Sequence, residues 1–486
     1  MAYRYGDDRN QMILFPETID QYVSDDHPVR AYDAFVDKLD FTQLGIQLDD
    51  RQVGNSSYDP RLMLKLLLYG YSYGVKSSRK LEREVHNNIS FIWLMKNLKP
   101  DHKTIAEFRR TNKGALKNAL KLCARLCIKL DLIQGNILFV DSTKIWADAG
   151  KSHQHQKKWY QKQLKKVDRT IEQILADCER IDQREAQQES LVKMPKELKD
   201  HQRLKASIES ALAEFGHLSE RTKDGKPREV NRVDPQSTQM KSPQGVHPCY
   251  AVQSVTDDKN GLIVHVDAVN DANDSAQLSS QIKGAEDNVG HECQIACADS
   301  GYSNIEEIEK VESEKRSVLV PSQQQASGKE PGPFDKSRFV YDRDQDCYYC
   351  PEGRRLPFRR FQDKEQKKRD YRIEKPALCK ACRHFGVCTK SKSGRTVTRH
   401  VFEELKQKVE QRYKDPEMLQ IYERRKSRAE HPFGYIKKAL NFRQFSLRGR
   451  NGVQAEASIL ATCFNLTRMI SLFGGVQQFM FKIATA

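Results

Sequence analysis

Two acidic residues follow short apolar runs that are typical of buried strands. Asp141 follows the run Ile137–Val140, and Asp299 ends a second run that contains Cys297. A carboxylate at the mouth of a buried strand is costly to remove from water. If the two strands are neighbours, the carboxylates meet at one sheet edge, and a hard divalent cation relieves their repulsion. The pattern therefore predicts a magnesium site at Asp141 and Asp299.

A third acid is needed if the site holds the pair of ions, roughly 4 Å apart, that assists many phosphoryl transfers. Glu430 is the candidate, because basic residues that can neutralise DNA phosphates surround it in the sequence. Any one of the three acids, taken alone, is more typical of a surface cap or turn. The neighbouring basic residues are Arg424, Arg425, Lys426, Arg428, Lys437 and Lys438.

Charge and length limit the class of protein. The chain has 486 residues, which suggests roughly three domains, and 82 Lys and Arg against 66 Asp and Glu give a formal charge of +16. Such an excess attracts polyanions, of which nucleic acid is the commonest; a merely basic globular protein is the alternative. The first 15 residues carry no secretion signal and no run of 18 apolar residues occurs, so we expect a cytoplasmic, nucleoid-associated protein without a membrane span.

Residues 1–130 read as short helices separated by tight turns. Asp59 and Pro60 begin one helix, Ser77 and Ser78 precede another, and Asp101 or Thr104 caps a third. This arrangement resembles a helix-turn-helix DNA-binding region, with an ordinary helical bundle as the alternative. The residues expected to contact phosphates are Arg79, Lys103, Arg109 and Arg110.

The region 131–320 alternates strands and helices, which predicts an α/β fold with a mixed sheet flanked by helices. Within it, residues 152–217 form a predicted helical hairpin: apolar residues from Tyr160 to Ile181 follow a heptad seam, and Pro195 interrupts the polar stretch after it. Two later strands flank Asn260-Gly261, a strong hairpin signal. Residues 401–486 return to helices and carry Glu430.

Five of the 12 cysteines lie in the basic, loop-rich segment 321–400. Two pairs with C-x2-C spacing are typical of a structural zinc ribbon, and unmetallated thiols in a degenerate insertion are the alternative. Phe and Tyr interleaved with Arg and Lys nearby suit phosphate contact with some base stacking, or a solvated loop. The expected Zn²⁺ ligands are Cys347, Cys350, Cys379 and either Cys382 or Cys388. The cysteines expected in the core are Cys123, Cys127, Cys293 and Cys297.

The order of these acids resembles the signature of the DDE transposases of insertion sequences, closest to the IS1182-like branch of the IS4/IS5 assemblage. Gly301 and Tyr302 follow Asp299 as in that family. The family's third signature places tyrosine, arginine, glutamate and lysine on one helix. The interval from arginine to glutamate is one residue longer here, so Lys426 is an alternative to Arg425 as the basic partner. The residues that match in order are Tyr422, Arg425, Glu430 and Lys437.

The resemblance implies an RNase H-like catalytic core behind an all-α domain that binds terminal repeats. It implies that Asp141, Asp299 and Glu430 hold two Mg²⁺ or Mn²⁺ ions for DNA cleavage and strand transfer, with Lys437 assisting. The partners would be double-stranded DNA of the element ends and of the target, bound by a homodimer. A non-catalytic DNA-binding derivative and a nuclease on the same scaffold are the alternatives. The resemblance places further DNA contacts at Tyr422, Arg425, Lys426 and Lys438.

Overall fold

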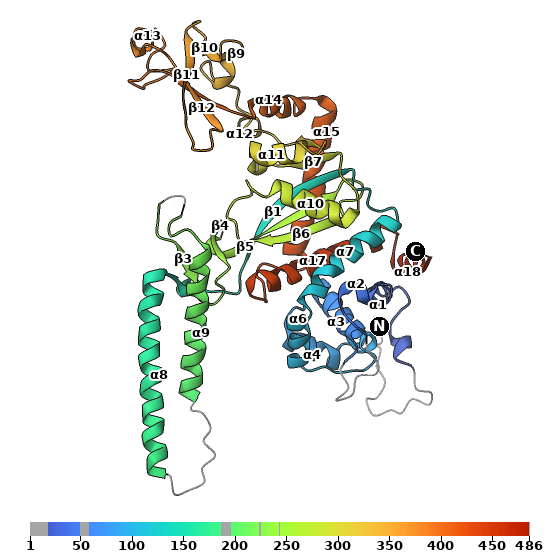
Figure 1. Ribbon diagram of the computed structural model, residues 1–486. Coiled ribbons are helices and arrows are strands. Elements are labelled where there is room, and N and C mark those ends of the chain that lie inside the picture. The colour runs from blue at the N-terminus through green and yellow to red at the C-terminus, as the bar shows by residue number, and fades with distance from the viewer. Residues whose placement is uncertain (1–17, 49–57, 186–195, 223–224, 243, 486) are drawn as a thin grey trace, which may run out of the picture. The chain divides into compact units, whose positions relative to one another are not determined.

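The computed structural model describes residues 18–48, 58–185, 196–222, 225–242 and 244–485 (Figure 1). The predictions made for the first 15 residues and for Pro195 lie outside this part of the chain. Contacts divide the chain into two compact units. The first comprises residues 1–134, 142–272 and 430–486, and the second comprises residues 135–141 and 273–429. Each unit is described by itself.

The first unit begins with the predicted short helices. Their starts follow from local chemistry: Asp59 caps one helix through the backbone N–H of Arg61 at 2.8 Å, and Asp101 caps another through the N–H of Thr104, also at 2.8 Å. The predicted caps at these two residues are confirmed. The elements are η1 (Ile19–Tyr22), α1 (Pro28–Asp37), α2 (Phe41–Leu44), α3 (Pro60–Ser72), α4 (Ser78–Asn87), α5 (Ile89–Leu94), α6 (His102–Thr111) and α7 (Lys113–Lys129).

Three antiparallel strands and a long helix form the core of the same unit. Strands β4 (Thr238–Ser242), β5 (Gly245–Asp257) and β6 (Ile263–Val269) pair in that order. Between β5 and β6 the chain turns at Gly261, whose φ of +67° suits glycine, and the predicted hairpin is confirmed. Helix α17 (Gly449–Leu472) is buried along most of its length and packs on β6, α7 and α3.

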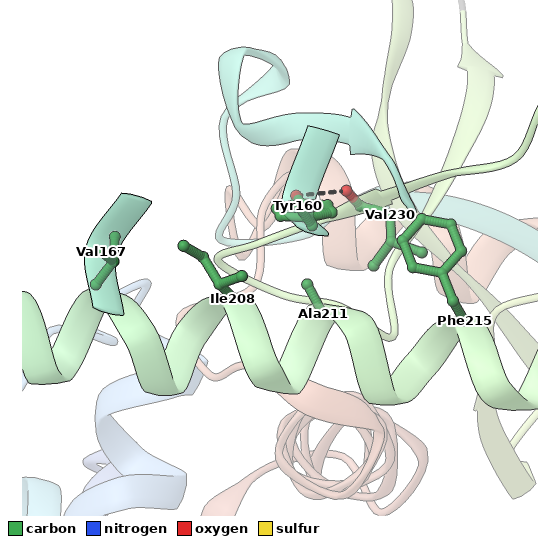
Figure 2. Packing of buried hydrophobic residues seen from close by; sticks show 6 residues of the cluster. All are labelled: Tyr160, Val167, Ile208, Ala211, Phe215 and Val230. Carbon is green, nitrogen blue, oxygen red and sulfur yellow. Dashed lines mark hydrogen bonds between the residues drawn. The ribbon is translucent and has the colours of Figure 1, made fainter. Parts of the chain in front are cut away.

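The predicted helical hairpin is also confirmed. Helices α8 (Lys157–Glu185) and α9 (Lys196–His217) lie side by side, and the small strands β2 (Gln154–Gln156) and β3 (Glu229–Asn231) pair at their base. The hydroxyl of Tyr160 donates to the carbonyl oxygen of Val230 at 2.9 Å, which ties helix to strand (Figure 2). The buried cluster consists of Tyr160, Val167, Ile208, Ala211, Phe215 and Val230.

The second unit is built on parallel strands. Strand β1 (Ile137–Trp146) pairs with β7 (Ile295–Ala298), and β7 pairs with β8 (Ser317–Leu319). The strand order in this unit is β1-β7-β8. The helices of this unit include α10 (Leu278–Val289), α11 (Ile305–Glu312), α12 (Gln323–Ala326), α14 (Glu403–Arg412) and α15 (Pro416–Arg425).

The expectation that the first strand stops at Asp141 is wrong. Pairing with β7 ends at Val140, but the strand continues to Trp146 in the first unit. The extended backbone finds new partners there: the N–H of Trp146 donates to the carbonyl of Arg443 at 3.1 Å, and the N–H of Ala147 donates to that of Pro248 at 2.9 Å. Asp141 therefore lies inside a strand, at the point where the strand passes from one unit to the other.

The cysteine-rich segment contains more regular structure than its sequence predicts. It forms an antiparallel sheet of order β13-β12-β11-β10-β9 around buried Tyr348, Leu356 and Tyr371. Arginine and lysine at exposed strand positions hide the alternation by which strands are recognised. The elements are β9 (Val340–Asp342), β10 (Cys347–Tyr349), β11 (Arg355–Phe361), β12 (Lys368–Arg372), α13 (Pro376–Lys380) and β13 (Thr396–His400).

The mixed sheet with flanking helices and the helical N-terminal part confirm the predicted fold class. The four cysteines expected in the core, Cys123, Cys127, Cys293 and Cys297, are all buried. Among the described helices none is by itself long and apolar enough to cross a membrane. Helices α17 and α18 (Val476–Thr485) meet that test of length and composition only as a pair, with a bend of 102° between them.

Candidate active site and basic groove

Asp141 and Asp299 lie next to each other across two parallel strands of the second unit. Val140 pairs with Ala298 in the β1–β7 ladder, so each aspartate directly follows a paired residue on strands that are about 4.8 Å apart. Alternation along an extended chain turns both carboxylates to the face that carries Phe139 and Cys297. The structure thus brings two of the three predicted acids together.

Helix α15 packs on that same face and supplies a cation. Nη1 of Arg425 lies 3.5 Å from Oδ2 of Asp141. The Arg425 side chain is 15% exposed and the Asp141 side chain is 14% exposed. The guanidinium carbon also lies 5.8 Å from the ring centre of Tyr422, and burial raises the pKa of that phenol to about 12. Lys426 is exposed. Arg425, rather than Lys426, therefore faces the first acid.

The extra residue between Arg425 and Glu430 has a structural counterpart. Residues Lys426–Glu430 form a π-helical turn between α15 and α16 (His431–Lys438). A π turn closes hydrogen bonds from i to i+5 and so accommodates one residue more than an α turn. The π turn takes up the extra residue, so Arg425 stays at the end of α15, where it contacts Asp141.

Asp299 is positioned by the turn that follows it. Its Oδ1 accepts the backbone N–H of Gly301 at 2.7 Å and caps the short helix η3 (Ser300–Tyr302). A Cβ atom at Gly301 would lie 2.9 Å from this oxygen and 4.0 Å from Oδ2 of Asp274. A side chain at residue 301 would therefore displace the Asp299 carboxylate, and Asp274 is a nearby acid that the sequence did not single out. It lies in the turn before α10, where no strand pattern marks it.

Glu430 and Lys437 belong to the first unit. Glu430 is exposed at the end of the π turn, and Lys437 follows on α16. The Nζ of Lys437 donates to the hydroxyl of Thr143 on β1. Lys437 is thereby fixed beside the residues that follow Asp141 in the chain.

A basic groove surrounds Lys437 in the first unit. Its cavity volume is about 470 Å³, and the described residues that line it include five cations and no carboxylate. The ring of Trp146 stacks on His247, with ring centres 4.4 Å apart and planes at 26°. Cations beside an aromatic wall suit a nucleic acid strand. The groove is lined by Ser142, Thr143, Lys144, Trp146, Lys241, Ser242, Gln244, Lys437, Lys438 and Arg443.

The basic residues expected to contact DNA in the N-terminal helices divide into two groups. Arg79, Lys103 and Arg110 are exposed. The expected exposure of Arg109 is wrong, since this side chain is buried and donates to the hydroxyl of Tyr71 at 3.2 Å and to the carbonyl of Lys76 at 2.8 Å. A guanidinium that links α6 to α3 in this way is held inside the fold.

No group of three His, Cys, Asp or Glu side chains within the described ranges is arranged to hold a metal ion. Asp141 and Asp299 nevertheless supply the donor type that Mg²⁺ prefers. This ion keeps several waters and binds through one or two carboxylates together with substrate phosphates. The pair of acids therefore fits the predicted ion chemically.

Two family models match parts of the chain. A transposase DDE domain matches residues 349–470, and a transposase domain matches residues 17–111. No curated protein sequence matches the chain. A solved piggyBac transposase synaptic complex with hairpin DNA is similar at 9% identity and a TM-score of 0.35, covering 94% of this chain and 79% of that one. The two matched domains and the order of the acids support the recognition of this chain as a DDE transposase of an insertion sequence.

Proposed function

We propose that the protein binds the ends of an insertion sequence and catalyses metal-dependent DNA cleavage and strand transfer. The observation that carries the proposal is the position of Asp141 and Asp299 at corresponding places on neighbouring parallel strands. A pair of carboxylates on rigid strands holds a cation well, and the match to a transposase DDE domain over residues 349–470, which contain Glu430, supports the proposal. Glu430 is proposed as the third acid from its place in the sequence signature.

Asp141, Asp299 and Glu430 would hold Mg²⁺ or Mn²⁺. Two bound ions would supply charge stabilisation at the scissile phosphate and lower the pKa of an attacking water. The first step is hydrolysis of a phosphodiester at an element end, which frees a 3′-OH. In the second step that hydroxyl attacks a target phosphodiester, so that one P–O bond forms as another breaks. No covalent protein–DNA intermediate is needed.

Arg425 keeps the Asp141 carboxylate in place before DNA binds, because their ion pair is mostly withdrawn from water. Tyr422 packs beside Arg425 and has a raised pKa. A phenol that resists ionisation is a poor nucleophile. Tyr422 is therefore assigned to positioning Arg425 rather than to attack on DNA.

The basic groove of the first unit would bind a DNA strand. Its lysines neutralise phosphates, and Trp146 offers an apolar surface for a base. Lys437 is oriented by Thr143, and Lys438 lines the same groove. Arg79, Lys103 and Arg110 on the N-terminal helices would contact the terminal repeats. Because both ends of an element must be joined, a homodimer on DNA is proposed.

Substitution of Asp141 tests the proposal most directly. We expect Asp141→Asn to abolish nicking of supercoiled plasmid in Mg²⁺ while binding to labelled duplex DNA stays close to wild type. Asp148→Asn is the matched control, since this acid follows the same strand but pairs at 2.9 Å with exposed Arg448. Cleavage that survives in Asp141→Asn, or that is lost equally in the control, contradicts the assigned site.

Three products distinguish the related functions. Fragments taken from either side of the coding sequence, incubated with the protein and Mg²⁺, give retarded complexes alone if the protein only binds DNA. They give nicked ends without joined products if it is a nuclease. Joined products that depend on a free 3′-OH are the result expected of a transposase.

A further inference from the structure

The five cysteines of the small sheet are not equivalent in the structure. Cys350 follows β10, whereas Cys379, Cys382 and Cys388 lie in the connection between β12 and β13. These four line one small cavity of about 30 Å³. Two separate segments, far apart in the sequence, thus bring four thiols to one place.

Cys347 faces the other way. Strand β10 alternates, and its middle residue Tyr348 belongs to the buried cluster of this sheet. Cys350, Cys379 and Cys388 pack against that cluster, but Cys347 does not. Cys347 lies instead beside Arg355. Strand alternation therefore separates Cys347 from the other four.

We propose that Cys350, Cys379, Cys382 and Cys388 bind one structural Zn²⁺ and that Cys347 is not a ligand. Four thiolates around one ion form one of the usual closed structural zinc sites, with Zn–S distances of about 2.3 Å. This inference concerns the stability of the small sheet and does not depend on the DNA chemistry proposed above. It changes the expected ligand set, in which Cys347 was one of the four.

The surroundings of the cavity suit a charged metal–thiolate group. The backbone N–H of Arg395 donates to Sγ of Cys379 at 3.5 Å, a contact that orients a sulfur ligand. Arg354 and Arg395 line the cavity as well, and they can balance the negative charge that four thiolates leave on a divalent ion. His384 also lines the cavity, with its Nε2 at 3.0 Å from Oε1 of Glu352, but four thiolates already complete a tetrahedral shell without it.

The cavity is small and its thiols are movable. A space of about 30 Å³ is close to the volume of one water molecule and is large enough for Zn²⁺. Among the described residues no three candidate ligands already have metal-binding geometry. Closure on an ion therefore requires rotation of cysteine side chains between staggered rotamers, which is a small change.

Metal content of the full-length protein is the test. Wild type purified without a metal-affinity tag should contain about one zinc per chain, measured by mass spectrometry. Ser at Cys350, Cys379, Cys382 or Cys388 should lower this at least tenfold after dialysis against a chelator. Cys347→Ser is the matched control and should keep the full content. Zinc lost in the control, or absent from wild type, overturns the inference.

Cobalt substitution covers variants that fold poorly with zinc removed. Chelator-treated wild type and Cys347→Ser should give the same absorption spectrum on addition of Co²⁺, with the intense visible bands of a tetrahedral tetrathiolate. Cys388→Ser should give a weaker, shifted spectrum, because it keeps at most three thiolates. A Cys388→Ser spectrum identical to wild type refutes the ligand set, whatever the outcome of the DNA cleavage assays.

Discussion

Gly301 gives the sharpest test of the proposed site, because the structure predicts a displacement of known size there. Its φ is not positive, so alanine meets no backbone strain at this position. The only obstacle is the Asp299 carboxylate: the new Cβ would lie 2.9 Å from Oδ1, whereas ordinary contacts begin at 3.4 Å. The oxygen must therefore retreat by about 0.5 Å, and the nearby Asp274 restricts its path.

A shift of that size should impair catalysis far more than folding. A misplacement of about 1 Å in a reacting group can lower a rate roughly 100-fold. For about half that shift we expect Gly301→Ala to reduce the plasmid nicking rate in Mg²⁺ about tenfold, which corresponds to about 1.4 kcal/mol of activation free energy. Duplex DNA binding, measured by fluorescence anisotropy, should change less than twofold.

Gly114→Ala is the control substitution. No atom lies within 4 Å of the Cβ that it would add near the start of α7. We expect an unchanged nicking rate and a free energy of unfolding higher by about 0.5–1 kcal/mol, since glycine inside a helix costs conformational entropy. If Gly301→Ala cleaves as fast as Gly114→Ala, the position of the Asp299 carboxylate does not control the reaction, and its assigned role is refuted.

Three further predictions test other parts of the structure. Arg425→Ala should lower nicking at least tenfold because it removes the guanidinium that lies 3.5 Å from the Asp141 carboxylate, whereas Lys426→Ala should have little effect in the same assay; equal effects would contradict the assignment. Ile208→Ala should destabilise the helical hairpin by about 2–5 kcal/mol, because it leaves a cavity in a fully buried cluster, and faster hydrogen exchange along α9 is the measurement. Burial raises the pKa of Glu456, so the free energy of unfolding should fall as pH rises above the ordinary glutamate pKa; Glu456→Gln should flatten that fall in urea titrations at successive pH values.

Much of this fold could be predicted because its local signals agree with its packing. The caps at Asp59 and Asp101 begin helices where the sequence places them. The heptad spacing from Tyr160 leads to a hairpin whose cluster is buried, and Asn260-Gly261 joins two paired strands. In each case residues close together in the sequence favour one local structure, and that structure is the one that forms.

Other features depend on contacts between residues distant in sequence. The strand at Asp141 continues to Trp146 because the carbonyls of Arg443 and Pro248, far along the chain, accept backbone N–H groups at its end, and nothing near Asp141 signals this. Arg109 has the sequence context of an exposed arginine, yet Tyr71 and Lys76 bury it. Asp274 approaches Asp299 only through the fold.

The π turn shows how an apparent defect in a sequence signature is resolved by backbone geometry. Counted along an α-helix, one extra residue between Arg425 and Glu430 would rotate the two side chains about 100° relative to each other and would favour Lys426 as the cation. The five-residue π turn accommodates the insertion locally. Arg425 therefore keeps its ion pair with Asp141, and the sequence signature can retain its function. Deletion of Ser427 would test this reasoning: it should convert the π turn to an α turn and preserve nicking, and a complete loss of nicking in a folded protein would contradict it.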